Sequence, residues 1–240
     1  MSVLRRVTDN VWIFPGDTRQ DRPNVGVICT PTQTILVDAG NSPHHARDVV
    51  AALMEMGAPP VSQVIYTHHH WDHVFGASEL DVPAVAHHLC RDILTRGAAE
   101  PWSAAYLERK MEEFPQWAGS YRAMGRAVQN WAEFRIVVPS ITFDQFHRLQ
   151  LDDLTLEMKH VGGQHAADSI IVYVRERGVI FLGDCYYGST THNNGAEWAI
   201  LEPLLDEAAE WFVDGHRRPL RRAELLRLRT ANLHLWPGKR

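Results

Sequence analysis

The first part of the chain consists of short apolar runs separated by turn residues, a pattern typical of β-strands. The runs at 11–14, 25–30 and 34–38 are rich in Val, Ile and Thr. Proline-containing turns separate the first two runs and the last two. Connections as short as these predict an opening antiparallel meander.

A helix is expected directly after this meander. Ser42 suits the N-cap and Pro43 the first helical position, and Gly57 can end the helix in the left-handed conformation. Apolar residues recur between them at helical spacing, namely Ala46, Val49, Val50, Leu53 and Met54. A strand over 61–67 follows without a long connection.

Strand and helix signals continue along the rest of the chain. They predict a strand at 82–86, a helix at 89–96, strands at 137–143, 149–151, 154–161, 169–174 and 178–182, a helix at about 197–211, a strand at 212–213 and a helix from 219. A hairpin turn is expected at Asp152 and Asp153. Strands in two groups, each followed by helices, predict an α/β fold in which two sheets pack together with helices outside.

The segment 99–131 departs from this pattern. It carries aromatic residues and methionines at helical spacing, among them Trp102, Trp117 and Met124. With 240 residues, 45% of them hydrophobic, one domain is expected, because layered α/β folds of this size are often undivided. We therefore interpret 1–240 as a single domain with a helical insertion at about 99–131. The insertion is either a cap that forms an apolar substrate pocket or plain core packing.

Composition and charge limit the classes of partner that we expect for this protein. A formal net charge of −5 gives no general attraction to nucleic acid or anionic lipid. The first residues lack the pattern of a secretory signal, and no apolar run is long enough to cross a membrane. Three widely spaced cysteines, Cys29, Cys90 and Cys185, fit a reducing cytoplasm. A small-molecule substrate is the expected partner, and the oligomeric state stays open.

Four candidate metal ligands lie where the strand at 61–67 ends. Residues two apart on an extended backbone point the same way, so His68 and His70 can bind one ion while His69 faces elsewhere. Asp72 and His73 then turn toward a second position. Imidazole and carboxylate together suit zinc and other borderline divalent metals.

Three further candidates follow apolar strands and one or more glycines. They are His165, Asp184 and His216. Three adjacent histidines alone could be a surface cluster, but ligand-type residues at several strand ends favour a built site. Asp38, which also ends a strand, is expected to cap a turn and support a ligand loop.

The order and spacing of these residues resemble the metallo-β-lactamase superfamily. His68, His70, Asp72 and His73 match its H-x-H-x-D-H signature, and Asp38 with Gly40, His165, Asp184 and His216 follow in the family's order. The resemblance spans about 11–216. It implies an αββα sandwich of two mixed β-sheets flanked by helices, with the site at one edge.

The resemblance also implies a ligand set and a chemistry. His68, His70 and His165 would hold one divalent ion, and Asp72, His73 and His216 a second, with Asp184 bridging. Zinc is the expected metal, with iron and manganese as alternatives. A metal-bridging hydroxide would attack an ester, thioester or lactone, and Asp72 would orient the nucleophilic water. Tyr187 resembles a tyrosine that some superfamily lactonases place beside the substrate carbonyl, where it could donate to an oxyanion.

Other reactions within the same superfamily are alternatives. A sulfur dioxygenase type of oxidoreductase uses one iron, whereas the intact second set Asp72, His73 and His216 favours two metals. A β-lactamase is disfavoured because a lysine expected shortly after Asp184 is missing. A phosphodiesterase acting on nucleic acid would need an arm or added domain that the sequence does not show. A binding module without activity would be expected to lack some ligands, and all seven are present.

Overall fold

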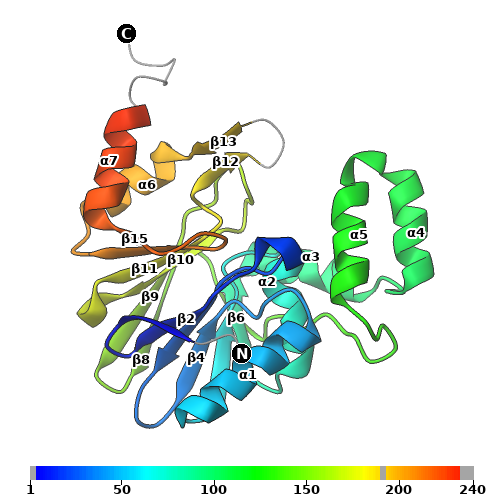
Figure 1. The fold of residues 1–240 in the computed structure, drawn as a ribbon, viewed down its shortest axis with the longest axis horizontal. Coiled ribbons are helices and arrows are strands. Elements are labelled where there is room, and N and C mark those ends of the chain that lie inside the picture. Colours follow the sequence, from blue (N-terminus) through cyan, green and yellow to red (C-terminus); the bar gives the residue numbers. More distant parts are fainter. Residues whose placement is uncertain (1–3, 190–192, 233–240) are drawn as a thin grey trace.

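Two large β-sheets stack face to face, and helices cover their outer faces (Figure 1). The computed structural model describes residues 4–189 and 193–232, with the backbone alone at 187–189, 193–195 and 232. Both sheets contain parallel and antiparallel pairs. The fold is therefore the α/β class that the sequence predicted, an αββα sandwich of two mixed sheets flanked by helices.

The first sheet has seven strands in simple chain order. They are β1 (Arg5–Thr8), β2 (Val11–Phe14), β3 (Val25–Cys29), β4 (Thr34–Val37), β5 (Val61–Ile65), β6 (Ala84–His87) and β7 (Ile141–Phe143). The strands from β1 to β4 pair antiparallel, which confirms the predicted meander. The strands from β4 to β7 pair in parallel, so their C-terminal ends share one edge.

The second sheet has six strands in the order β15-β14-β11-β10-β9-β8. They are β8 (Phe146–Leu151), β9 (Leu154–His160), β10 (Ile170–Val174), β11 (Val179–Gly183), β14 (Trp211–Asp214) and β15 (Leu220–Arg221). The pair β11 and β14 is parallel, and the other pairs are antiparallel. A separate hairpin is formed by β12 (Tyr187–Ser189) and β13 (Asn193–Ala196).

Helices lie on both outer faces of the sandwich. They are α1 (Pro43–Met56), α2 (Trp71–Val74), α3 (His88–Ala98), α4 (Ala104–Glu113), α5 (Ala118–Ala127), α6 (Trp198–Leu204) and α7 (Arg222–Asn232). Short 3₁₀ turns are η1 (Thr18–Gln20), η2 (Phe75–Glu79), η3 (Pro115–Trp117) and η4 (Arg175–Arg177). Helix α1 begins as predicted: the Ser42 hydroxyl accepts the N–H of His45, and Gly57 ends the helix at φ +71°.

Three layers of buried side chains correspond to the three interfaces of the sandwich. Ile28 and Ile35 of the first sheet meet Leu156 and Val172 of the second in the central layer. An outer layer packs α1 and α3 against the first sheet, and another packs α6 and α7 against the second, while α4 and α5 pack on each other and project to one side of the sandwich (Figure 1). The central strands β3, β4, β10 and β11 are thus buried on both faces, which explains why they are almost continuously apolar.

Some boundaries differ from the sequence prediction for local reasons. The strand expected at 137–143 is only β7, because Pro139 has no N–H to join a ladder. The helix expected at about 197–211 ends at Leu204, one residue after Pro203, and Trp211 belongs to β14. Strand β1 was not predicted, because its exposed edge position lacks an apolar alternation.

Candidate metal centre

Strand ends from both sheets converge at one edge of the sandwich. His68 and His70 lie in the connection from β5 to α2, and His165 lies in the loop between β9 and β10. Asp184 follows β11, and His216 follows β14. A backbone hydrogen bond of 2.8 Å from Ile170 N to Thr67 O joins the two sheets at this edge. Loops from distant parts of the chain are therefore held in register.

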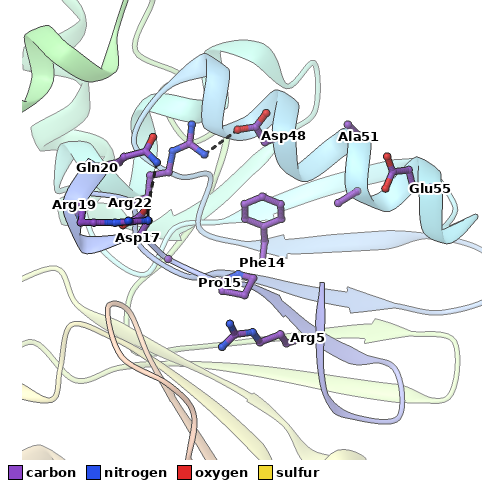
Figure 2. A pocket seen from close by; sticks show the side chains of 12 residues that line it. Arg5, Phe14, Pro15, Asp17, Arg19, Gln20, Arg22, Asp48, Ala51 and Glu55 are labelled. Carbon is purple, nitrogen blue, oxygen red and sulfur yellow. Dashed lines mark hydrogen bonds and ion pairs between the residues drawn. The ribbon is translucent and has the colours of Figure 1, made fainter. Parts of the chain in front are cut away.

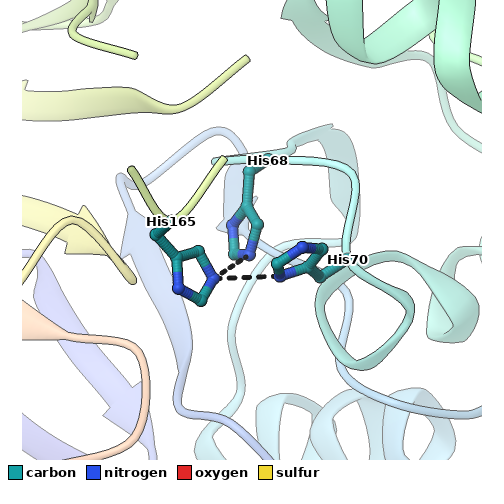
Figure 3. A group of neighbouring side chains, drawn as sticks. All are labelled: His68, His70 and His165. Atoms are coloured by element: carbon teal, nitrogen blue, oxygen red, sulfur yellow. Dashed lines mark hydrogen bonds between the residues drawn. The ribbon is translucent and has the colours of Figure 1, made fainter. Parts of the chain in front are cut away.

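His68, His70 and His165 form one compact group of imidazoles (Figure 3). The Nε2 atom of His165 lies 2.9 Å from Nδ1 of His70 and 3.3 Å from Nε2 of His68. A tetrahedral zinc ion with bonds of about 2.0–2.1 Å separates neighbouring ligand atoms by roughly 3.3–3.4 Å. The three nitrogens are close enough together to coordinate one ion.

Asp72, His73 and His216 form a second group. The Nε2 atom of His216 lies 3.2 Å from Asp72 Oδ2, and Nε2 of His73 lies 3.6 Å from the same oxygen. His73 is fully buried, and Asp72 lies in the short helix α2 with its side chain 16% exposed. The second group therefore has two partly exposed donors, Asp72 and His216, and one in the interior, His73.

Asp184 lies between the two groups. Its Oδ2 atom is 3.3 Å from His165 Nε2 and 3.3 Å from His216 Nε2, and its Oδ1 atom is 3.4 Å from His73 Nε2. The structure thus brings together all seven residues that the sequence singled out as ligands. Tyr187, the other predicted site residue, has a side chain that lies outside the described residues.

The donor set fits metal ions on a structural observation. His73 Nε2 and Asp184 Oδ1 are both buried and face each other at 3.4 Å, but neither has a partner at hydrogen-bond geometry among the described residues. A buried polar atom without a partner is costly, so such atoms usually have a partner that protein hydrogen bonds do not supply. Imidazole nitrogens with carboxylate oxygens are ligands of zinc, iron and manganese.

Asp38 is a buried carboxylate that contacts Thr67 and one candidate ligand, His73. Its Oδ1 accepts the Thr67 N–H at 2.7 Å, and its Oδ2 accepts the Thr67 hydroxyl at 2.9 Å. The same Oδ2 lies 2.7 Å from His73 Nδ1. If the Nδ1–H of His73 donates to Asp38, the Nε2 atom faces Asp184 and can bind an ion once it has lost its proton. The sequence predicted a supporting role for Asp38 in a ligand loop, and these contacts confirm it.

Gly215 allows the loops to approach closely. A Cβ at Gly215 would overlap Asp184 Oδ1 and would lie 3.0 Å from the His73 ring. A larger residue there would push β14 and its loop away from the β11 end. The loop before His216 lies so close to Asp184 and His73 that position 215 has room only for glycine.

Burial is the largest cause of the pKa shifts in the first group, and neighbouring histidine rings add to it. It lowers the pKa of His68 and of His165 below the ordinary histidine value, and it lowers the pKa of His70 to about 4. All three rings are therefore neutral at pH 7 and have lone pairs available to a cation.

Charge pairing governs the second group. Burial opposes ionisation of Asp184, but the His73 and His216 rings hold the pKa of this carboxyl well below its usual range. Burial also opposes charge on the two rings, yet the carboxylates outweigh it. They raise the pKa of His73 well above the ordinary value, and hydrogen bonds to Asp184 and Asp72 raise the pKa of His216 to about 10.

Loading this centre with cations is expected to release protons. His73 and His216 are protonated at pH 7 without metal because their pKa values are raised, and a protonated nitrogen cannot bind a cation. We expect Zn²⁺ to displace about two protons from these rings per chain, so that apparent affinity rises with pH below the His216 pKa of about 10. Calorimetry in buffers of different ionisation enthalpy measures the release.

A His216→Gln variant is the control for this proton count. Glutamine keeps a hydrogen-bonding side chain but carries no titrating proton, so fewer protons should leave on Zn²⁺ binding. Equal release from the two proteins would contradict the assignment of the proton to His216.

The sequence reasoning missed one polar pair beside the centre. His69 turns away from its two neighbours, as expected, and its Nδ1 lies 2.7 Å from Oδ1 of the buried Asp168. Asp168 comes three residues after His165, but no local signal links it to His69, which lies 99 positions earlier. The pair ties the β9–β10 loop to the loop that carries His68 and His70.

A cavity of about 810 Å³ lies elsewhere, between the first strands and α1 (Figure 2). Two of its three arginines are already paired: Arg22 Nη1 lies 2.8 Å from Asp48 Oδ2, and Arg19 Nη2 lies 2.8 Å from Asp17 Oδ2. None of the seven candidate ligands lines it. We therefore assign no reaction to this cavity despite its size.

Comparison with known families agrees with this geometry. Residues 18–213 match the model of the metallo-beta-lactamase superfamily. The chain therefore belongs to that superfamily, as its sequence resemblance indicated.

Individual relatives are distant. The linear primary-alkylsulfatase of Pseudomonas sp. (strain ATCC 19151) is 22% identical over 187 residues, which cover 70% of this chain but 34% of that protein. The chain thus spans about a third of the length of this relative.

Two solved structures share the fold over nearly the whole chain. A metallo-beta-lactamase from Pontibacter korlensis aligns with a TM-score of 0.65 and 16% identity, covering 97% of this chain and 99% of that chain. The stereoselective inverting sec-alkylsulfatase Pisa1 from Pseudomonas sp. aligns with a TM-score of 0.64 and 19% identity, covering 98% of this chain and 43% of that chain.

Among the described residues, no helix is long and apolar enough to span a membrane.

Proposed function

We propose that this chain is a dinuclear metal-dependent hydrolase that acts on an ester, thioester or lactone. The observation that carries the proposal is the position of Asp184, with Oδ2 at 3.3 Å from both His165 Nε2 and His216 Nε2. A carboxylate shared by two groups of three donors suits a bridging ligand between two cations. Family membership supports the same assignment.

Each residue of the metal centre would have its own role in the reaction. The first ion would be held by His68, His70 and His165, the second by Asp72, His73 and His216, and both by Asp184. Two bound divalent cations would lower the pKa of a shared water toward neutrality and polarise the bond under attack. Asp72, which is partly exposed, would also orient the attacking water and accept its proton. We propose Tyr187 as a hydrogen-bond donor to the acyl oxygen.

Sulfate ester hydrolysis is the second candidate. The observation in its favour is the match to the linear primary-alkylsulfatase, together with the structural likeness to Pisa1. These matches are 22% and 19% identical and cover 34% and 43% of those proteins, so they do not carry the sulfate ester substrate over to this chain. We therefore rank a carboxyl-derivative substrate first.

Metal analysis combined with a substrate panel tests the proposal. We expect two divalent ions per chain, because seven candidate ligands exceed what one tetrahedral ion can use. Activity should be lost on chelation and regained with Zn²⁺, Fe²⁺ or Mn²⁺. The panel comprises a carboxyl ester, a thioester, a lactone, an alkyl sulfate, a phosphodiester and a β-lactam, with oxygen uptake measured in parallel.

Each result of this panel has a distinct meaning. Turnover of carboxyl substrates by protein with two ions supports the first candidate, and turnover of the alkyl sulfate alone supports the second. Full activity with one ion would exclude the dinuclear assignment. Oxygen consumption without hydrolysis would replace the hydrolase with an oxidoreductase.

A further inference from the structure

An apolar pocket of about 480 Å³ opens directly beside the candidate metal centre. His70 and Asp72 line one end of it. Helix α3 contributes Leu94, and α5 contributes Met124. The pocket is therefore lined both by candidate ligands and by the helical segment at 99–131. This segment begins more than 25 positions after Asp72 in the sequence.

The polar groups of the pocket are confined to few positions. Among the described residues that line it, the ionisable side chains are His69, His70, Asp72 and Tyr121, and no lysine or arginine is present. The other lining side chains are apolar or aromatic, apart from Ser120. An occupant would thus meet the reacting centre at one end and hydrocarbon along the rest of its length.

The walls of the pocket are fixed by packing that does not depend on an occupant. The Trp102 ring stacks on Trp131 with centroids 6.0 Å apart and meets Phe75 edge-on at 5.2 Å. Its indole N–H donates to Gly97 O at 2.8 Å. Trp117, by contrast, is 45% exposed and lies at the opening. A tail that enters would cover this exposed aromatic surface.

We propose that the pocket binds the uncharged apolar tail of an amphiphilic ester whose reacting group lies at His70 and Asp72. The proposal rests on the proposed hydrolytic function and adds the substrate class. Apolar surface at Trp117 and along α3 and α5 would leave water on binding, and this burial would supply most of the substrate's affinity. A charged tail would be excluded, because its charge would lose hydration without finding an opposite charge.

Binding of straight-chain carboxylates to the metal-loaded protein tests this without any turnover. Acids from butanoate to dodecanoate present an anionic head to the cations and a tail of increasing length to the pocket. We expect the Kd to fall roughly fourfold for each added methylene until the pocket is full, as measured by calorimetry or tryptophan fluorescence. A Kd independent of chain length would overturn the proposal.

Variants of pocket residues locate the binding site. Ser120→Trp should fill the pocket and weaken decanoate binding at least about tenfold, with butanoate binding and metal content unchanged. Trp117→Ala, an exposed change with little risk to folding, should weaken decanoate binding by several fold. Phe146→Ala is the matched control, because Phe146 is 49% exposed and does not line the pocket.

The outcomes separate this inference from the proposed function. If decanoate binds the Ser120→Trp and Trp117→Ala variants as tightly as the unchanged protein, the tail binds elsewhere and the inference is wrong. Binding only where the acids form micelles would mean surface adsorption and would also overturn it. Chain-length dependence in a protein that hydrolyses no ester would leave the pocket assigned and refute the hydrolase. Hydrolysis of an ester without any dependence of binding on chain length would support the hydrolase and refute the assignment of the pocket.

Discussion

Replacement of Asp72 by alanine is expected to lower kcat by about 10²–10⁴-fold, the usual contribution of a positioned general base. The variant loses one candidate ligand of the second ion and the acceptor that would orient the attacking water. His216 also loses a partner, because its Nε2 lies 3.2 Å from Asp72 Oδ2. Steady-state kinetics on the best substrate, together with metal content per chain, measure the effect.

The fold should survive this replacement, because Asp72 lies in a short surface helix with its side chain 16% exposed. Asp81→Ala is a matched control, since Asp81 is an exposed aspartate outside the site. Asp72→Asn keeps the shape and one acceptor oxygen, so it should retain more metal than Asp72→Ala. Near-normal kcat in a folded Asp72→Ala protein would remove Asp72 from the mechanism.

Replacement of Asp38 by alanine is expected to have the largest effect on stability, a loss of about 3–5 kcal/mol in the free energy of unfolding. Asp38 is 2% exposed and accepts hydrogen bonds from the Thr67 N–H and hydroxyl while it lies 2.7 Å from His73 Nδ1. Its removal leaves several buried polar groups without a partner. Denaturation by urea in the metal-free state measures the change.

Asp152→Ala provides the matched control for this loss. Both aspartates have positive φ, 64° at Asp38 and 52° at Asp152, so alanine is strained at both positions by about 1–2 kcal/mol. Asp152, however, bonds the Thr32 hydroxyl at the surface. The larger loss in the free energy of unfolding at Asp38 therefore measures the contribution of its buried hydrogen bonds to Thr67 and His73. Asp38→Ala should also weaken metal binding about 10–100-fold, and equal stability losses at the two sites would contradict the role assigned to Asp38.

Local structure was predictable from the sequence wherever the deciding interactions are local. Helix α1 depends on Ser42, Pro43 and Gly57, which act within a turn of its ends, and its observed bounds match. The antiparallel meander of β2, β3 and β4 follows from short connections. Two elements are shorter than predicted, and each is limited by a proline: β7 begins after Pro139, and α6 ends one residue after Pro203. Pattern reasoning extended both because their apolar residues continue beyond the hydrogen-bonded part.

The candidate ligands were also predictable, because their residue types and spacing are specific even though they are far apart. His68 and His165 are separated by 97 positions, yet their Nε2 atoms lie 3.3 Å apart. Each lies in the loop that follows a strand, His68 after β5 and His165 after β9, and the sequence displays this position. Tyr187 was singled out only by its resemblance to a tyrosine of superfamily lactonases, and its role stays a prediction.

By itself, then, the sequence determined the fold class, the superfamily and the set of residues that could hold metal, since these depend on residue type and short-range order. Tertiary structure alone decided what surrounds the centre. The pairing of His69 with Asp168, and the pocket that Met124 and Trp117 line together with Asp72, depend on how separate loops and helices pack. No periodicity encodes such contacts, because they are set by the relative positions of elements whose own sequences would allow many partners.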